Sequence, residues 1–262
     1  MSIAGTLPGH GRVAVVTGAA GGLGKAFCDE LQTRGYEVVG VDIQGKQRRL
    51  DVTDAQACRD LARELRPDVW INNAGVLGSG SAAEQSDEQI AQVVSVNLLG
   101  VINGSRAAVS VMRERGSGHI LNMGSLASWL VPPGETVYSA TKHAVRAFSV
   151  GLAGELRGTG IRISLLCPDG IWTPMLYDRL DDPHSAMSFT ASRLLDPVQV
   201  ARRGMRLLEH PRLAACIPSA RGLLSKLAGI NPPLNLRAAR MLARKGQKVQ
   251  ARMKAEQAKT QQ

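Results

Sequence analysis

The sequence predicts an α/β protein built on one doubly wound parallel sheet with helices on both faces. Short, nearly continuous apolar runs rich in β-branched residues recur along the chain, and longer stretches of helical composition separate them. A glycine-rich turn joins the first run to the first helical stretch. Continuously apolar strands indicate a sheet buried on both faces, and helices between consecutive strands indicate parallel pairing.

The elements follow in order from this pattern. We expect strands over residues 13–17, 37–42, 50–52, 69–72, 119–123, 161–167 and 213–217. We expect helices over residues 22–34, 55–66, 88–115, 138–158 and 197–210. Only nine positions separate Asp42 from Asp51, too few for a full crossover helix, so a loop is expected there. Residues 174–195 should form a mobile lid, and Asn231-Pro-Pro233 a break before a tail.

Length and charge distinguish a body from a tail. A chain of 262 residues can bury roughly 70–75% of its unfolded surface as one domain. The net charge is +10, but residues 221–262 hold ten basic residues against the single acid Glu256, or +9. We therefore expect residues 1–220 to form the main domain and residues 221–262 a basic, helical C-terminal extension.

The cysteines and the N-terminus narrow the class of protein. Cys28, Cys58, Cys167 and Cys216 are scattered, so we expect reduced thiols, with no disulfide framework and no metal site. The N-terminus has no apolar signal region, and no run approaches the ~18 apolar residues of a membrane span. A cytoplasmic location is the expectation.

The glycine-rich turn reads Thr17-Gly-Ala-Ala-Gly-Gly-Leu-Gly24. Glycines let the backbone approach a pyrophosphate closely, and the N-terminus of the following helix offers free N–H groups and a partial positive charge. A glycine triplet alone could serve any tight turn. Its position between the first strand and the first helix predicts a dinucleotide site.

Asp42 closes the second expected strand, eighteen residues after Gly24. A carboxylate there can accept hydrogen bonds from the adenosine ribose and would repel a 2′-phosphate, which favours NAD over NADP. The alternative is a solvated aspartate at a strand end. Lys46, Arg48 and Arg49 lie nearby and keep some tolerance of NADP open.

Tyr138 and Lys142 stand four residues apart, so on a helix they share one face. A neighbouring ammonium favours phenolate and lowers the pKa of a tyrosine. Lowering it by about three units needs roughly 4 kcal/mol, which one charge about 4 Å away supplies at an effective dielectric near 20. With the charge of a cofactor added, the pair therefore predicts a tyrosine that acts as general acid/base near neutral pH.

Over roughly residues 10–220 the chain resembles the short-chain dehydrogenase/reductase family, which has a Rossmann-type fold. The resemblance rests on TGAAGGLG at 17–24, Asp42, DV at 51–52, NNAG at 72–75, Asn97, Ser125, YSATK at 138–142 and the segment 168–173. It implies a nicotinamide-dependent oxidoreductase that acts as a dimer or tetramer.

The resemblance also implies the roles of single residues. The catalytic set would be Asn97, Ser125, Tyr138 and Lys142, with Asn97 holding a relay water, Ser125 polarising the substrate oxygen and Tyr138 transferring the proton. Cofactor contacts would come from Gly18, Gly22, Leu23, Gly24, Asp42, Asp51, Val52, Asn73, Ala74, Gly75, Tyr138, Lys142, Ile171 and Thr173. Ser125 could instead only cap the next segment, and Asn97 could only bond neighbouring backbone. Asp169 stands where the family commonly has glycine, which weakens the expected contacts of Ile171 and Thr173.

Apolar residues flank the expected catalytic residues and predict an apolar secondary alcohol or ketone as substrate, such as a steroid, terpenoid or lipid. They are Trp129, Leu130, Val131, Pro132, Pro133, Val137, Met175, Leu176, Tyr177, Met187 and Phe189. Ordinary core or subunit contacts are the alternative. A different class of function is a non-catalytic NAD-binding sensor or scaffold, for which an activated phenol has no use.

In the tail, residues 234, 238, 241, 242, 249 and 253 approximate one apolar helical face among basic residues. Such a helix could lie on an anionic membrane, contact a protein, or remain a solvated extension. No aromatic residue follows Phe189, so base stacking is unavailable and specific nucleic-acid binding is disfavoured.

Overall fold

The structure is a computed structural model and describes residues 9, 11–191 and 193–260. Its strands form one parallel sheet in the order β3-β2-β1-β4-β5-β6-β7. They are β1 (Val13–Thr17), β2 (Glu37–Asp42), β3 (Arg48–Arg49), β4 (Val69–Asn72), β5 (Gly118–Met123), β6 (Ile161–Pro168) and β7 (Ala214–Ile217). The order reverses between β1 and β4, which opens a crevice at the carboxyl ends of the strands, where open α/β sheets bind ligands.

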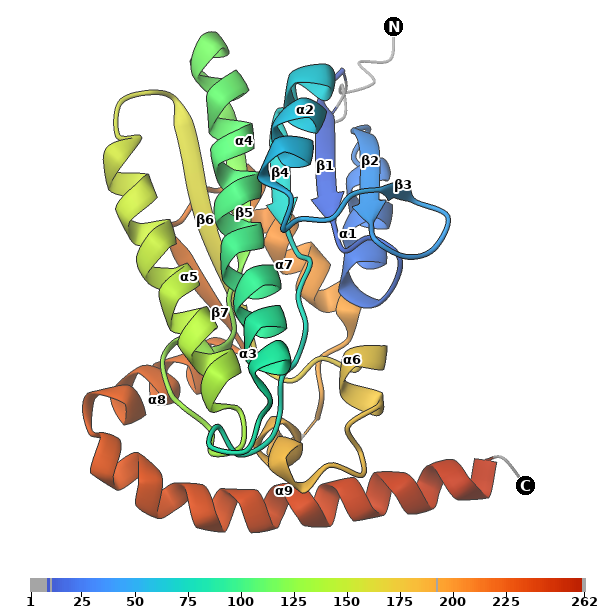
Figure 1. Cartoon of the computed structure of the whole chain (residues 1–262), viewed down its shortest axis with the longest axis vertical. Helices are drawn as coiled ribbons and strands as arrows, with labels where there is room; N and C mark the ends of the chain where they lie inside the picture. Colours follow the sequence, from blue (N-terminus) through green and yellow to red (C-terminus); the bar gives the residue numbers. More distant parts are fainter. Residues whose placement is uncertain (1–8, 10, 192, 261–262) are drawn as a thin grey trace, which may run out of the picture.

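Helices cover both faces of the sheet, so the fold is of the Rossmann type. On one face lie α1 (Gly22–Gln32) and α7 (Pro197–Glu209), which pack against each other. On the other lie α2 (Ala55–Leu65), α4 (Gly100–Arg115) and α5 (Thr136–Glu155), and Figure 1 shows α4 and α5 in front of the sheet. The helix α3 (Asp87–Val94) and the π-helical turn η1 (Ser95–Leu99) lead directly into α4.

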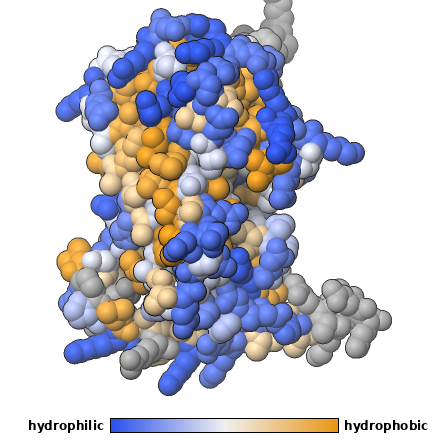
Figure 2. Space-filling view, in the orientation of Figure 1, coloured by the Kyte–Doolittle hydropathy of each residue, from blue (hydrophilic) through white to orange (hydrophobic). Residues whose placement is uncertain are grey.

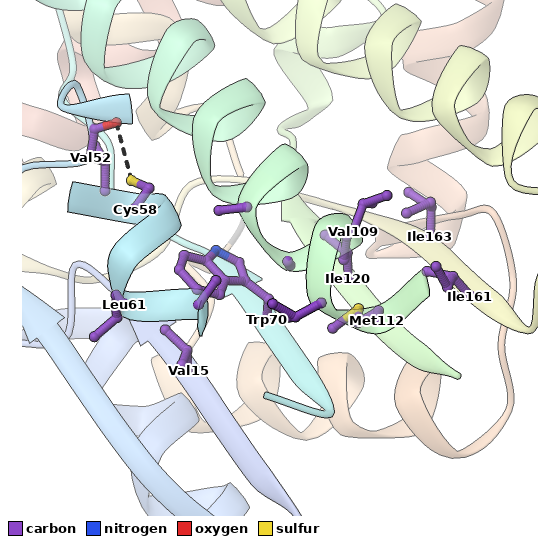
Figure 3. Close-up of a cluster of buried hydrophobic side chains, with 14 of the residues drawn as sticks. Val15, Val52, Cys58, Leu61, Trp70, Val109, Met112, Ile120, Ile161 and Ile163 are labelled. Carbon is purple, nitrogen blue, oxygen red and sulfur yellow. Dashed lines mark hydrogen bonds between the residues drawn. The ribbon is translucent and has the colours of Figure 1, made fainter. Parts of the chain in front are cut away.

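The apolar run of β4 shows why the strands read as continuously hydrophobic. Val69 and Ile71 point into the core under α1 and α7, whereas Trp70 points into the core under α2 and α4. Figure 3 shows the Trp70 indole within this second cluster. Its Nε1 donates to Asn72 Oδ1 at 2.8 Å, so the polar atom of a fully buried ring is satisfied.

Most expected boundaries agree with the structure, and β1, β2 and β4 match to the residue. The strand expected over 50–52 is wrong, because β3 is the exposed pair Arg48–Arg49. Leu50 and Val52 instead lie in a loop that buries both side chains in the core. The helix expected over 88–115 is interrupted by η1, a π-helical turn that contains the buried Asn97.

The C-terminal residues form two helices, α8 (Ser219–Ile230) and α9 (Pro232–Thr260), separated at the expected break. Figure 1 shows α9 lying across the end of the molecule toward which the strands point. It packs against the short helix η3 (Pro183–Phe189), which with α6 (Pro174–Tyr177) occupies the segment expected as a lid. Where it contacts η3, α9 is therefore packed on the fold and is not a solvated extension.

One stretch of the described chain, Asp87–Arg115, is long and apolar enough to cross a membrane by length and composition. Half of its most apolar window is buried inside the fold. It packs against α2, α5 and the sheet, as a core helix of a folded domain does.

Candidate active site

A cavity of about 930 Å³ opens at the carboxyl ends of the strands, at the topological switch point. Its walls bring together every site residue expected from the sequence except Asn97. Those residues come from the turn after β1 and the start of α1, the end of β2, the loop after β3, helix α5 and the segments after β4, β5 and β6. The cavity is therefore the candidate active site.

The glycine turn forms the tightest part of this wall. Gly18 has φ +69°, and a Cβ there would lie 2.8 Å from Ala74 Cα. Asn73 Nδ2 donates to the carbonyl oxygens of Thr17 and Gly18, at 3.0 and 3.1 Å, and ties the turn to the end of β4. A Cβ on Gly24 would overlap the Gly18 carbonyl. Glycine is therefore required for the turn itself, and the turn lies in the cavity wall at the N-terminus of α1, where the residues fit a pyrophosphate.

Asp42 lies at the end of β2 on the same cavity wall. Its carboxylate accepts from the backbone N–H of Ala20 at 2.9 Å and of Gln44 at 3.1 Å, which orients it beside the glycine turn. The nearby guanidinium groups have partners other than Asp42. Arg48 pairs with Glu64, and Arg49 donates to the Ile43 carbonyl. Asp42 thus presents a carboxylate in this corner of the cavity, while Arg49, bonded to the neutral carbonyl of the cavity residue Ile43, keeps its positive charge nearby.

Asn97 lies outside the cavity wall and anchors the loop after β4. Its Oδ1 accepts from the backbone N–H of Val76, and its Nδ2 donates to the Val76 carbonyl, both at 2.8 Å. The π-helical turn presents this buried amide to the loop that carries Asn73, Ala74 and Gly75. The alternative left open by the sequence, bonding to neighbouring backbone, is present, and the relay-water role stays a prediction.

Ser125, Tyr138 and Lys142 converge at the inner end of the cavity. Ser125 follows β5, and the other two lie on one face of α5, where Lys142 Nζ is 5.5 Å from the centre of the Tyr138 ring. The Lys142 ammonium donates to the Met123 carbonyl at 3.0 Å. Ser125 Oγ also accepts from the Ala127 N–H at 3.1 Å, so this serine caps η2 (Leu126–Ser128) as well as facing the cavity.

Burial is the main cause of the pKa shifts of Tyr138 and Lys142. The pKa of Tyr138 is raised above its ordinary value, first by burial and then by the neighbouring Glu135 carboxyl, while a hydrogen bond with Ser125 acts in the opposite direction. Burial lowers the pKa of Lys142 to about 8. Burial, which disfavours the phenolate, is thus the largest influence on the pKa of Tyr138, and the lowering expected from Lys142 together with the cofactor stays a prediction.

Two features of the cavity have no counterpart in the sequence expectations. Glu135 is buried three residues before Tyr138, accepts a 2.6 Å hydrogen bond from Ser188 Oγ, and has a pKa raised to about 7 by burial. Its position directly before α5, three residues from Tyr138, could have indicated it as a site residue. Arg221 forms an ion pair with Asp169 and donates to Thr190 Oγ1 at 3.1 Å. Arg221 lies 52 residues from Asp169, so only the fold unites them.

Many of the remaining residues that line the cavity are apolar, with Gln92 and Ser225 among the polar ones. Of the flanking residues expected there, Leu130, Pro132, Met175, Leu176 and Met187 line it. Trp129 lies apart from the wall, between the cations of Arg146 and Lys226, and Phe189 is buried in the core. Residues that the sequence did not indicate complete the wall: Leu224, Leu227 and Ala228 of α8, and Leu242 of α9.

Known proteins resemble this chain in sequence and in fold. The family model for short chain dehydrogenases matches residues 12–183. The 2-(R)-hydroxypropyl-CoM dehydrogenase of Xanthobacter autotrophicus is 33% identical over 198 residues, 66% of this chain and 79% of that protein.

Solved structures agree with that match. A short-chain dehydrogenase/reductase from Burkholderia phymatum in complex with NAD superposes with a TM-score of 0.77, at 26% identity, over 86% of this chain and 95% of that one. A structure from Beutenbergia cavernae with bound NADP has a TM-score of 0.71, at 27% identity, over 81% and 97% of the two chains.

Proposed function

Because the chain belongs to the short-chain dehydrogenase family, we propose that it is an NAD(H)-dependent oxidoreductase for an apolar secondary alcohol or ketone. The observation that carries the proposal is the convergence of Ser125, Tyr138 and Lys142 in one cavity with the glycine turn and Asp42. A binding module needs the turn and the carboxylate but has no use for the tyrosine set, which argues against a non-catalytic sensor or scaffold.

The preference for NAD rests on Asp42. Its carboxylate is held at the adenosine end of the cavity, where it would accept the ribose hydroxyls and repel a 2′-phosphate. The relatives bind either cofactor, NAD in the Burkholderia protein and NADP in the Beutenbergia protein, so the preference must come from this chain's own residues.

The residues of the inner cavity would move the proton. The nicotinamide, when bound, supplies the hydride donor or acceptor. Tyr138, with its raised pKa, is protonated at neutral pH and is suited to donate a proton to a substrate carbonyl oxygen during reduction. Ser125 would hold that oxygen by hydrogen bonding, and the buried Lys142 ammonium would bind the adjacent ribose and favour the proton's return in alcohol oxidation.

We further propose that the enzyme acts in the cytoplasm as a homodimer or homotetramer. Members of its family are commonly oligomeric, and Leu99 and Val150 are 47% and 46% exposed on the side of the molecule formed by α4 and α5. Figure 2 shows an apolar band on the side where Figure 1 draws these two helices. Exposed apolar bands of this kind mark protein contacts.

The test is a spectrophotometric screen for formation of reduced nicotinamide. Purified protein is given NAD or NADP with steroid, terpenoid, aliphatic and sugar alcohols. We expect NAD-dependent turnover of an apolar class, abolished by Tyr138→Phe with NAD binding intact. The control Tyr36→Phe, far from the cavity against Arg12, should remain active. Turnover that survives Tyr138→Phe would overturn the proposed mechanism.

A further inference from the structure

The corner where α8 turns into α9 exposes apolar side chains to an unusual degree. Six large apolar residues there are between 55% and 79% exposed, more than any other large apolar residue in the described part of the chain. They are Leu223, Leu224, Leu227, Ile230, Leu236 and Met241, which we name the apolar corner. Figure 2 shows apolar atoms at the lower left, where Figure 1 places the end of α8. Such a patch marks a surface that is covered in use.

Two residues of the apolar corner also line the cavity. Leu224 and Leu227 are 64% and 55% exposed, yet both line the cavity, as does Leu242 on α9. One continuous apolar surface therefore runs from the outside of α8 to the inner wall. Whatever covers the apolar corner lies against the entrance that a substrate would use.

The outer face of α9 is basic. Its inner face packs on η3, with Ala239, Gly246 and Gln250 buried. A Cβ on Gly246 would overlap the Ala186 carbonyl, which shows how closely the two helices approach. The opposite face carries Arg237, Arg244, Lys245, Lys248 and Arg252, all exposed. These five residues, which we name the basic face, extend from the apolar corner along the helix.

The charge of the tail distinguishes among the partners that could cover the apolar corner. A second copy joined by two-fold symmetry would bring two apolar corners together and two basic tails of +9 close to each other, at a cost in repulsion. A nucleic acid would pair with the basic face but would leave the aliphatic side chains in water. An anionic bilayer satisfies both features, because aliphatic groups enter the headgroup boundary while basic groups meet anionic lipids.

We propose that the apolar corner and the basic face bind an anionic lipid surface, and that the substrate enters the cavity directly from that surface. The substrate is then a bilayer-dissolved alcohol or ketone. This second part rests on the proposed function, whereas the lipid binding does not.

Co-sedimentation of the full-length protein with vesicles tests whether the apolar corner and the basic face bind lipid. The vesicles contain either phosphatidylcholine alone or phosphatidylcholine with about a third phosphatidylserine. The test variant is Leu223→Ser/Ile230→Ser, which alters two exposed residues that do not line the cavity. The control is Leu213→Ser, exposed at the start of β7, at the other end of the sheet. A charge variant is Lys245→Gln/Lys248→Gln.

We expect wild-type protein and the control to sediment with anionic vesicles at least tenfold more than with neutral ones. Each double variant should bind at least tenfold less, and binding should fall as salt screens the basic face. Wild-type protein that stays in solution, or a Leu223→Ser/Ile230→Ser variant that binds equally, overturns the proposal. So does a fall in oligomer mass in that variant without loss of lipid binding, since the apolar corner would then be a subunit contact.

Enzyme kinetics distinguish lipid binding from entry of the substrate through the lipid surface. With a lipophilic alcohol in anionic vesicles, wild-type protein should show a KM several-fold lower than the Leu223→Ser/Ile230→Ser variant, with equal kcat. A water-soluble alcohol should be turned over equally by both. Vesicle binding without turnover of either alcohol would count against the proposed function while supporting the surface, and equal KM values in vesicles would overturn entry from the lipid.

Discussion

Glu135 is the ionisable residue through which pH should act most strongly on the site. Its carboxyl is 2% exposed, has a pKa raised to about 7, and lies close enough to Tyr138 to raise the phenol's pKa as well. A carboxyl that is neutral in the fold below neutral pH and charged above it links stability to catalysis.

Glu135→Gln should abolish a pH-dependent loss of stability. The folded carboxyl binds its proton more tightly than the unfolded one, whose pKa is about 4.5. The wild-type protein therefore loses free energy of unfolding as pH rises from about 4.5 through about 7. Relative to wild type, the variant should gain on the order of 3 kcal/mol across that window. Chemical denaturation at about pH 4.5 and about pH 8 measures this.

The same substitution should shift the pH profile of alcohol oxidation to lower pH, because the charge that raises the pKa of Tyr138 is removed. The exposed Glu84→Gln provides the control and should change neither quantity. A stability difference that does not vary with pH would contradict the assigned ionisation of Glu135.

Asp42→Asn should weaken the discrimination between the two cofactors. The N–H groups of Ala20 and Gln44 donate to different oxygens of Asp42, so the amide can keep only one of these two hydrogen bonds, and it loses the charge that would repel a 2′-phosphate. The ratio of kcat/KM for NAD to that for NADP should fall roughly tenfold, equivalent to about 1.4 kcal/mol. Asp29→Asn, on the exposed side of α1 beside Lys25, should leave the ratio unchanged. An unaltered ratio in Asp42→Asn would place the preference in another residue.

The contact between α9 and η3 holds one wall of the substrate half in place. Leu242 of α9 and Met187 of η3 both line the cavity, and Val249 and Met253 of α9 join the small apolar cluster around Phe189. Because α9 depends on this contact for its position, the tail and the cavity are mechanically connected.

Gly246→Ala should displace α9. The added methyl group would overlap the Ala186 carbonyl, which belongs to backbone that cannot rotate away. Hydrogen exchange across residues 240–253 should accelerate at least tenfold, and apparent KM should rise as the wall of Leu242 moves. Gly151→Ala is the matched control, since nothing lies within 4 Å of its added Cβ and it lies in α5. Equal exchange in the two variants would show that the α9–η3 contact is not close in solution.

Across the whole molecule, the apolar band over α4 and α5 is the surface expected to join subunits, and the apolar corner lies apart from it at the end of α8. An interface over α4 and α5 would leave the cavity mouth and α9 free to face a lipid surface.

Val150→Asp should dissociate the oligomer, because a carboxylate placed in an apolar interface must be desolvated without a partner. Light scattering should give a multiple of 27.9 kDa for wild type and 27.9 kDa for the variant. Val131→Asp, an exposed apolar residue in the loop before α5, should retain the wild-type mass. An oligomer that persists in Val150→Asp would place the interface elsewhere.

The sequence by itself determined the elements and the cofactor half of the cavity. Strands such as β4, which is buried on both faces, can be predicted from apolar runs, and the glycine turn can be predicted from a local steric requirement. Both features depend mainly on residues close together in the chain. It also predicted the residues now gathered around Ser125, Tyr138 and Lys142, whose roles stay predictions.

Only the tertiary structure determined the pKa values of the buried groups and the way α9 packs on the fold. Desolvation depends on what surrounds a group in space, so the raised pKa values of Glu135 and Tyr138 have no sequence signal. The face of α9 expected from large apolar residues included Met241, which is 69% exposed, while the side chains of Leu234 and Ala238 are not among those described. Val249 and Met253 of that face do pack in the cluster around Phe189, and the helix also packs through Ala239 and Gly246, because a close approach to backbone requires small side chains at those two positions.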